Sequence, residues 1–213
     1  MNPRGSDAGD EAVQRTPWGV SLAYGQFSAT LRFDDAPDMR VKQHLVCARL
    51  SYSFDDGWYL AGALGAVVDG ALFNETRSLH FRPGFVGTLQ AGVLVMRGQG
   101  ALPFIESSIN LSVSHGALLD DADTASSWTA IDVRLGATTG WRIADVWVPY
   151  VALRVFGGPV LWSEGGVERV GSDSHHFQVA VGSTLSVFGV DLFVDWGLPI
   201  GESGLAAGVA LQF

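Results

Sequence analysis

The chain has 213 residues and a formal net charge of −9, a length that fits one domain and an acidity that disfavours nucleic-acid binding. The longest stretch without strongly polar residues, Leu60–Val68, is far shorter than the roughly 20 residues of a membrane-spanning helix. The single cysteine, Cys47, excludes an internal disulfide framework, and we interpret it as a small buried side chain rather than a reactive thiol.

The first half of the chain predicts five β-strands. Residues 1–16 form a polar N-terminal tail, and the β-strands occupy residues 17–213. The expected strands are Trp18–Phe33, Val41–Phe54, Trp58–Val68, Phe85–Met96 and Ile105–Ser114. In the first strand the apolar phase changes at Gly25–Gln26, which predicts a β-bulge. We expect a tight hairpin at Asp55–Gly57 and a long polar loop over Asp69–Arg82.

The second half continues the same pattern. The expected strands are Trp128–Arg142, Val146–Gly158, His176–Phe188, Val190–Leu198 and Leu205–Phe213. The Gly-rich segment Pro159–Ser174 is predicted to be a loop. Short and long connections alternate, which is typical of barrels with tight periplasmic turns and longer outer loops. An even strand count then places both termini on the periplasmic side.

Aromatic residues collect at both ends of the predicted strands, as expected for rings at the two boundaries of a bilayer. The set near the short turns is Trp18, Tyr52, Phe54, Trp58, Trp141, Trp147 and Phe213. The set near the long loops is Phe33, Phe81, Phe85, Trp162 and Phe177.

The distribution of charge separates a membrane barrel from a soluble one. A soluble ligand-binding barrel such as a lipocalin also alternates, but it turns apolar residues inward. Here one parity of the mid-strand positions has no charge, and the other contains Arg49, Glu106, Asp132, Arg134, Arg154, Asp191 and Asp195. An Arg or Lys facing lipid at mid-bilayer costs roughly 2–4 kcal/mol, so the charged parity should face the lumen.

The lumen of a ten-stranded barrel is narrow, because side chains nearly fill eight strands and open channels appear near sixteen. Mixed charges in a confined interior should pair. We therefore expect an ion-paired polar plug, with a narrow conduit for small solutes as the alternative.

The last strand carries a resemblance to known proteins. Leu205, Ala207, Val209, Leu211 and Phe213 share one face, and Phe213 ends the chain. This pattern resembles the closing strand of small Gram-negative outer-membrane β-barrel proteins of about 8–10 strands, where it is the assembly signal. The resemblance implies an all-β, closed, antiparallel up-and-down transmembrane β-barrel of about ten strands in the outer membrane. It also implies outer-membrane lipid, lipopolysaccharide and the barrel assembly machinery as partners, with other envelope proteins as a further possibility and no nucleic acid.

One loop segment carries the weak catalytic candidates. Asp173 and His175 are similar to the Asp-x-His pair of the omptin family, ten-stranded outer-membrane proteases, in which the carboxylate orients a general base. The second aspartate pair that omptins need has no match, because the loop after the third strand offers only Glu75 and His80. No metal-ligand spacing or phosphate-binding loop occurs, and we expect no cofactor. The sequence favours a non-enzymatic surface-interaction or envelope-complex component, with the narrow pore and an omptin-like surface hydrolase as alternatives.

Overall fold

The computed structural model describes residues 17–120, 124–200 and 202–213, and this part of the chain forms thirteen β-strands. The strands are β1 (Trp18–Phe33), β2 (Met39–Ser53), β3 (Trp58–Phe73), β4 (Ser78–Phe81), β5 (Gly84–Arg97), β6 (Phe104–Leu119), β7 (Ala125–Gly140), β8 (Trp147–Gly157), β9 (Pro159–Glu164), β10 (Val167–Asp173), β11 (Phe177–Val187), β12 (Val190–Ile200) and β13 (Glu202–Gln212). All paired strands are antiparallel. No helix in the described residues is long and apolar enough to cross a bilayer.

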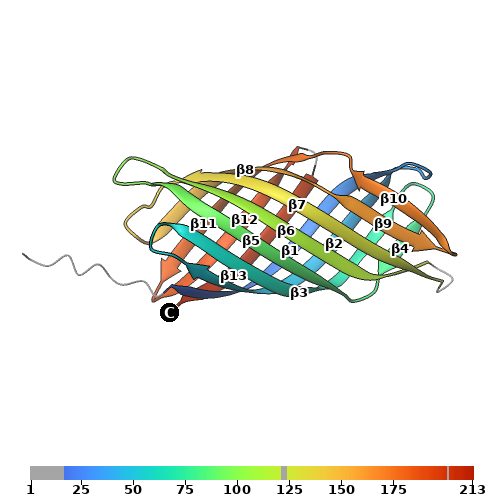
Figure 1. Cartoon of the computed structure of the whole chain (residues 1–213), viewed down its shortest axis with the longest axis horizontal. Helices are drawn as coiled ribbons and strands as arrows, with labels where there is room; N and C mark the ends of the chain where they lie inside the picture. The colour runs from blue at the N-terminus through green and yellow to red at the C-terminus, as the bar shows by residue number, and fades with distance from the viewer. Residues whose placement is uncertain (1–16, 121–123, 201) are drawn as a thin grey trace, which may run out of the picture.

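Ten of the described strands close into a ring in the order β1–β2–β3–β5–β6–β7–β8–β11–β12–β13, because β13 pairs with β1 (Figure 1). The predicted all-β, up-and-down barrel of about ten strands is therefore confirmed. The short turns after β2, β5, β7 and β11 lie at the end where the chain terminates, and we call this the turn end. The turn between β11 and β12 is the tightest, and both Phe188 and Gly189 adopt positive φ there.

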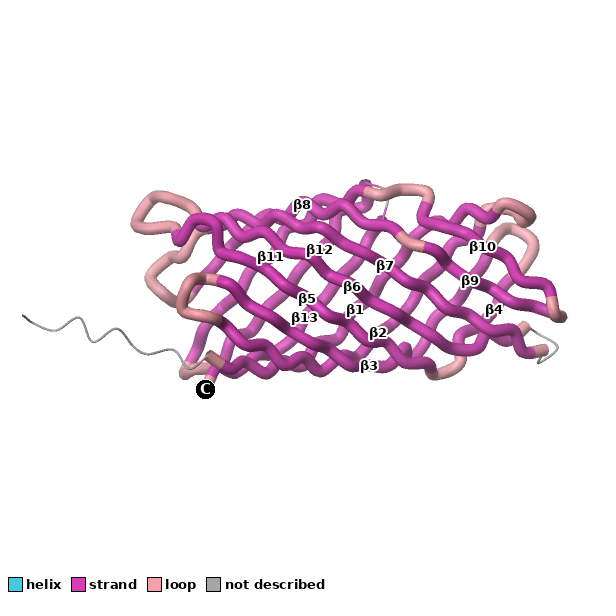
Figure 2. Tube along the Cα trace, viewed as in Figure 1, coloured by secondary structure: helices cyan, strands magenta, loops and turns pink. Residues whose placement is uncertain are grey.

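The opposite end of the barrel is built as a second, smaller ring. Beyond the reach of β13, β1 pairs with β10 through Leu31–Phe33, and β10 pairs with β9. Strand β9 then pairs with the outer part of β7, while β4 bridges β3 and β6. Within the described residues, eight strands thus close this ring: β1, β2, β3, β4, β6, β7, β9 and β10. Figure 2 shows β4, β9 and β10 gathered at this end, which we call the head.

Two predicted loops are strands of the head, so the sequence interpretation was wrong at both. Residues 69–82 continue β3 to Phe73 and include β4, and residues 159–174 fold into the hairpin of β9 and β10. Their inward side chains are apolar and buried, including Leu72, Leu79 and Trp162. This burial, together with pairing to distant strands, stabilises segments whose composition resembles surface loop.

The predicted bulge at Gly25–Gln26 is also wrong, because β1 keeps an unbroken register with both β2 and β13 there. The same face of β1 points inward along its whole length. What changes is the environment, since this face carries small residues such as Ala23 near the turn end and buried Leu31 and Phe33 in the head. Register shifts lie instead between β2 and β3 at His44 and Leu45, between β5 and β6 at Leu94 and Met96, and between β12 and β13 at Gly197 and Ile200.

The outer wall of the ten-stranded ring is apolar. Exposed side chains on it include Val20 and Leu22 of β1, Leu64 of β3, and Leu89 and Val95 of β5. Two to four such residues per described ring strand, on strands of 11 to 16 residues, match the span of a tilted transmembrane strand. An exposed band of this kind on every strand of a closed ring fits lipid rather than water.

Candidate functional site

The interior of the head is a hydrophobic core. The buried residues that form it are Ala29, Leu31, Phe33, Met39, Val41, Val67, Leu72, Leu79, Phe81, Leu118, Trp128, Val160 and Trp162. Leu72, Leu79 and Leu118 have no exposed surface at all. Ring pairs add packing, with Phe33 and Trp162 centroids 5.7 Å apart and Phe81 and Trp128 centroids 5.4 Å apart. The core fills the interior of the head with apolar side chains.

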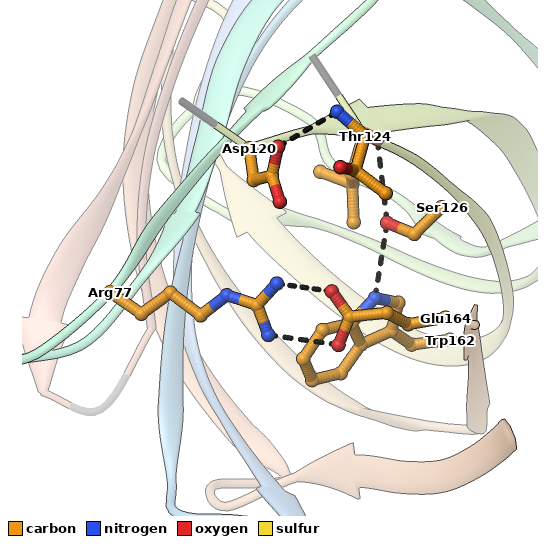
Figure 3. Close-up of polar contacts among 7 residues, drawn as sticks. Arg77, Asp120, Thr124, Ser126, Trp162 and Glu164 are labelled. Carbon is orange, nitrogen blue, oxygen red and sulfur yellow. Dashed lines mark hydrogen bonds and ion pairs between the residues drawn. The ribbon is translucent and has the colours of Figure 1, made fainter. Parts of the chain in front are cut away.

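Polar contacts hold the outermost layer of the head together (Figure 3). Arg77, in the connection between β3 and β4, forms a two-pronged ion pair with Glu164 at the end of β9. These hydrogen bonds raise the pKa of Arg77 further above its ordinary value, so the guanidinium is always charged. Trp162 lies between Arg77 and Arg169, whose guanidinium carbons are 5.6 Å and 5.5 Å from its ring, and its indole N–H donates to Ser126 Oγ.

The lumen within the ten-stranded ring is polar. Arg154 of β8 donates to both carboxylate oxygens of Asp195 of β12, at 2.9 Å and 2.6 Å. Arg154 also donates to the side-chain carbonyl of Gln178, and the Tyr150 hydroxyl donates to Asp195 at 3.0 Å. This cluster ties three adjacent strands together from the inside.

A second lumen cluster surrounds Tyr59 of β3. Its hydroxyl donates to Glu106 Oε1 at 2.8 Å and accepts a hydrogen bond from Gln90 Nε2 at 2.9 Å. The guanidinium carbon of Arg49 lies 5.9 Å from the centre of the Tyr59 ring. The ring lies against Gly92 on the neighbouring strand, where a Cβ would come within 2.4 Å of it, so only glycine permits this position.

The remaining predicted lumen residues complete the description. Arg134 pairs with Asp132 of its own strand at 3.4 Å, and its guanidinium lies over the Phe156 ring. Asp191 accepts from the Ser186 hydroxyl across the β11–β12 hairpin. The seven residues therefore form separate clusters rather than one continuous network. The Glu106 carboxylate accepts a hydrogen bond from Tyr59, whereas the sequence interpretation expected an ion pair there.

The polar filling does not continue through the barrel. The sequence interpretation expected a polar lumen along the whole chain, and the apolar head core contradicts this for the outer part. The physical reason is that the head strands extend past the apolar band of the wall. There the outward positions are polar, as at Thr30, Arg32, Arg40 and Lys42, and the interior is free to be apolar.

The predicted aromatic set at the turn end is found on the outer wall. Trp18, Tyr52 and Phe54 stack edge to face with centroids 4.9 Å apart, and Trp58, Trp141, Trp147 and Phe213 are exposed nearby. The set predicted for the other boundary is only partly on the wall. Phe85 and Phe177 are exposed, but Phe33, Phe81 and Trp162 are buried in the head core.

Strand β13, which carries the alternating apolar residues that end in Phe213, closes the ring. β13 pairs with β12 and β1, and the Phe213 amide donates to the Trp18 carbonyl at 3.1 Å. Leu205, Val209, Leu211 and Phe213 are exposed on the outer wall, and so is Ala207.

The weak catalytic candidates lie at the end of β10 and just after it. Asp173 is the last residue of β10 and is aligned with Leu31 of β1, while His175 is exposed and its Nδ1 lies 2.9 Å from Ser174 Oγ. His176 contacts the Phe156 carbonyl instead. Among the described residues, no group of three or more His, Cys, Asp or Glu side chains could hold a metal ion.

Sequence reasoning missed the head core and the residues that complete the lumen clusters. Tyr59, Tyr150 and Gln178 are neutral, so a search for charged residues overlooks them. A usable signal existed for β4 of the head, because Leu79 and Phe81 alternate with Ser78, His80 and Arg82 within a segment taken as a loop.

Comparison with solved structures places the architecture. The chain is similar to the outer membrane protease OmpT from Escherichia coli, with 9% identity, a TM-score of 0.56, and coverage of 95% of this chain and 99% of that chain. It is similar to the translocator domain of the autotransporter NalP from Neisseria meningitidis, with 10% identity, a TM-score of 0.53, and coverage of 93% and 89%. It is also similar to the β domain of the Bordetella autotransporter BrkA, with 15% identity, a TM-score of 0.52, and coverage of 93% and 100%. No family model and no curated protein sequence matches the chain. The fold is therefore that of Gram-negative outer-membrane β-barrel proteins.

Proposed function

We propose that the chain is a non-enzymatic, non-conducting barrel of the outer membrane that presents its head at the cell surface as a contact surface for envelope components. The observation that carries this proposal is the apolar core across the head end of the lumen. An ion that entered from the turn end would reach the buried side chains of Leu31, Leu72 and Leu118, which offer no polar group in exchange for its water shell.

The proposed orientation places the head outside and both termini in the periplasm. Between the strands of the ten-stranded ring, the connections at the turn end have two to six residues, and the two longest connections, 74–83 and 158–176, are at the head, which matches the usual outer side of transmembrane barrels. The closing strand β13 ends with Phe213 at the turn end. We expect the assembly machinery to contact this strand.

A sealed lumen is tested by conductance. The purified protein, reconstituted in planar bilayers, should give no discrete channel openings under conditions in which a known porin conducts. Folding is verified on the same sample by its heat-dependent gel mobility. Steady ion currents from the correctly folded protein would contradict the proposal and favour the narrow pore.

Several observations disfavour the hydrolase alternative. The His175 Nδ1 lies 2.9 Å from Ser174 Oγ, and the loop after β3 has Glu75 and His80 where the omptin resemblance requires a second aspartate pair. The similarity to OmpT concerns the fold alone at 9% identity.

A contact role is tested in cells by placing a photo-crosslinking amino acid at exposed Ser172 of the head and, as a control, at exposed Asp56 of the turn end. Surface partners should be captured from Ser172 only.

A further inference from the structure

The hairpin of β9 and β10 is drawn across the end of the barrel. Among the described strands, β8, β11, β12 and β13 lie between β7 and β1 in the ten-stranded ring, whereas only β9 and β10 lie between them in the head. Two strands therefore span in the head what four strands span below, so the hairpin covers the lumen on that side (Figure 2). Gln178, the first inward residue of β11, is only 4% exposed, as expected under such a cover.

Both ends of this hairpin leave the ten-stranded ring at one point. Strands β8 and β11 pair with each other, and residues 158–176 connect them. The Phe156 amide donates to the His176 carbonyl at 3.0 Å, which joins the outgoing and the returning chain just below the hairpin, and we call this connection the hinge. A segment whose two ends are held side by side can move as one body about that line, with Gly157 and Gly158 in the outgoing chain to absorb the change in φ and ψ.

Short stretches of pairing hold the hairpin against the rest of the head. Strand β10 is aligned with β1 over Leu31–Phe33, and β9 with β7 over Ser127–Ala130. Val160 and Trp162 are the hairpin's members of the head core, and the other described core residues belong to strands that pair with one another without it. The rest of the head therefore keeps its own strand pairing when the hairpin moves away.

The tip of the hairpin is fastened to the far side of the head. Glu164, the last residue of β9, forms the two-pronged ion pair with Arg77, and one of its two hydrogen bonds is 2.8 Å long (Figure 3). Arg77 lies between β3 and β4. In the head ring, β6 and β7 separate β9 from β4, while β10, β1 and β2 separate it from β3. The ion pair thus spans the head instead of joining neighbouring strands, and it opposes an outward movement of the hairpin.

We propose that β9 and β10 form a lid that opens as a unit about the hinge, is locked by the Arg77–Glu164 ion pair, and when open gives small hydrated ions a passage between the lumen and the space beyond the head. The structure shows the closed state. Opening uncovers the end of the lumen above β11, where Arg154 and Gln178 are hydrogen-bonded at 3.1 Å and offer polar groups to a hydrated ion. It exposes the buried Trp162 and breaks the ion pair, so the wild-type lid is closed almost all the time and the barrel is sealed.

Opening of the lid is tested by native-state hydrogen exchange with mass spectrometry on the folded protein in lipid nanodiscs. Residues 159–173 should exchange together and ahead of β8 and β11, because a two-stranded hairpin detached from its neighbours is only marginally stable. R77Q should speed the exchange of residues 159–173 about tenfold, because it removes a charge-assisted pair that only the closed lid makes. The control R32Q removes a head cation whose ion pair with Asp38 does not involve the hairpin, and it should leave the exchange unchanged.

The passage is tested by conductance in planar bilayers. W162A removes the buried anchor of the lid and should give discrete openings that the wild-type protein lacks. Adding R32C/S172C, which links aligned residues of β1 and β10, should abolish these openings when oxidised and restore them when reduced. Adding S163C/E168C, which links β9 only to β10, should leave the openings unchanged in both states.

All cysteine variants carry Cys47→Ser, and folding of each variant is verified by heat-dependent gel mobility. Exchange of residues 159–173 at the rate of β8 and β11, equal effects of R77Q and R32Q, a silent W162A, or equal effects of the two disulfides would each overturn the lid. Currents that persist in the otherwise wild-type protein with the oxidised R32C/S172C bridge would instead contradict the sealed core of the proposed function, and the exchange results would still decide the lid.

Discussion

At the scale of single residues, the most informative contact is the pairing of Arg154 with Asp195. Both side chains are about four-fifths removed from solvent, with 23% and 16% exposed. The arginine has two partners, because it also donates to Gln178, and Asp195 accepts a further hydrogen bond from the Tyr150 hydroxyl. Removing one member leaves a carboxylate in a confined lumen without its counter-charge.

We predict that R154A lowers the free energy of unfolding by about 2–4 kcal/mol, because breaking a largely buried pair costs more than the pair contributes. Urea unfolding in lipid vesicles, followed by tryptophan fluorescence, measures this. R154M/D195N removes both charges and should recover part of the loss. The exposed-turn variant R142A should unfold like the wild type, and an equal loss there would contradict the explanation.

At the scale of elements, the hairpin of β9 and β10 decides whether the head is ordered. Trp162 is its main anchor, with 3% exposure and contacts to Phe33, Ser126 and two guanidiniums. Strands β8, β11, β12 and β13 do not pair with this hairpin. The head and the ten-stranded ring therefore have partly separate sources of stability.

We predict that W162A destabilises the head by about 3–5 kcal/mol through the cavity it leaves, while the membrane ring stays folded. Limited proteolysis should then cleave within residues 159–173, and the heat-dependent gel mobility should persist. V170A, at an exposed outward position of β10, is the matched control and should remain resistant. Loss of the folded gel band in W162A would show that the two parts are not separable.

The same element shows where sequence reasoning succeeds and fails. The alternation of apolar and polar residues correctly predicted which of Ile105, Glu106 and Ile109 in β6 face outward and which faces the lumen, because the wall is apolar and the lumen is polar there. It failed at Phe33 and Trp162, because inward residues become apolar where the strands extend past the apolar band. One rule for which face of a strand is apolar therefore cannot describe both the ten-stranded ring and the head. The Tyr59–Glu106 and Tyr150–Asp195 contacts also depend on register between strands, which the sequence alone leaves open.

At the scale of the whole molecule, charge and hydropathy are arranged along the long axis. The ten-stranded ring has an apolar wall and a polar interior, and the head has a polar exterior and an apolar interior. An arrangement that reverses in this way has a defined direction across a membrane.

We predict that, in a Cys47→Ser background, S172C is labelled by an impermeant maleimide on intact cells, because Ser172 is exposed on the head. D56C, at an exposed turn, should react only after the outer membrane is permeabilised. The reverse pattern would contradict the proposed orientation while leaving the fold unchanged.

One edge of β1 is shared lengthwise between two partners, with Gly19–Ser28 on β13 and Leu31–Phe33 on β10. During synthesis, a chain that has emerged through Asp173 already contains every strand of the smaller ring. The larger ring still lacks three strands at that stage. If the smaller ring closes first, the final strand enters a slot already fastened at the head, and its pairing with β1 advances from Ser28 towards Gly19.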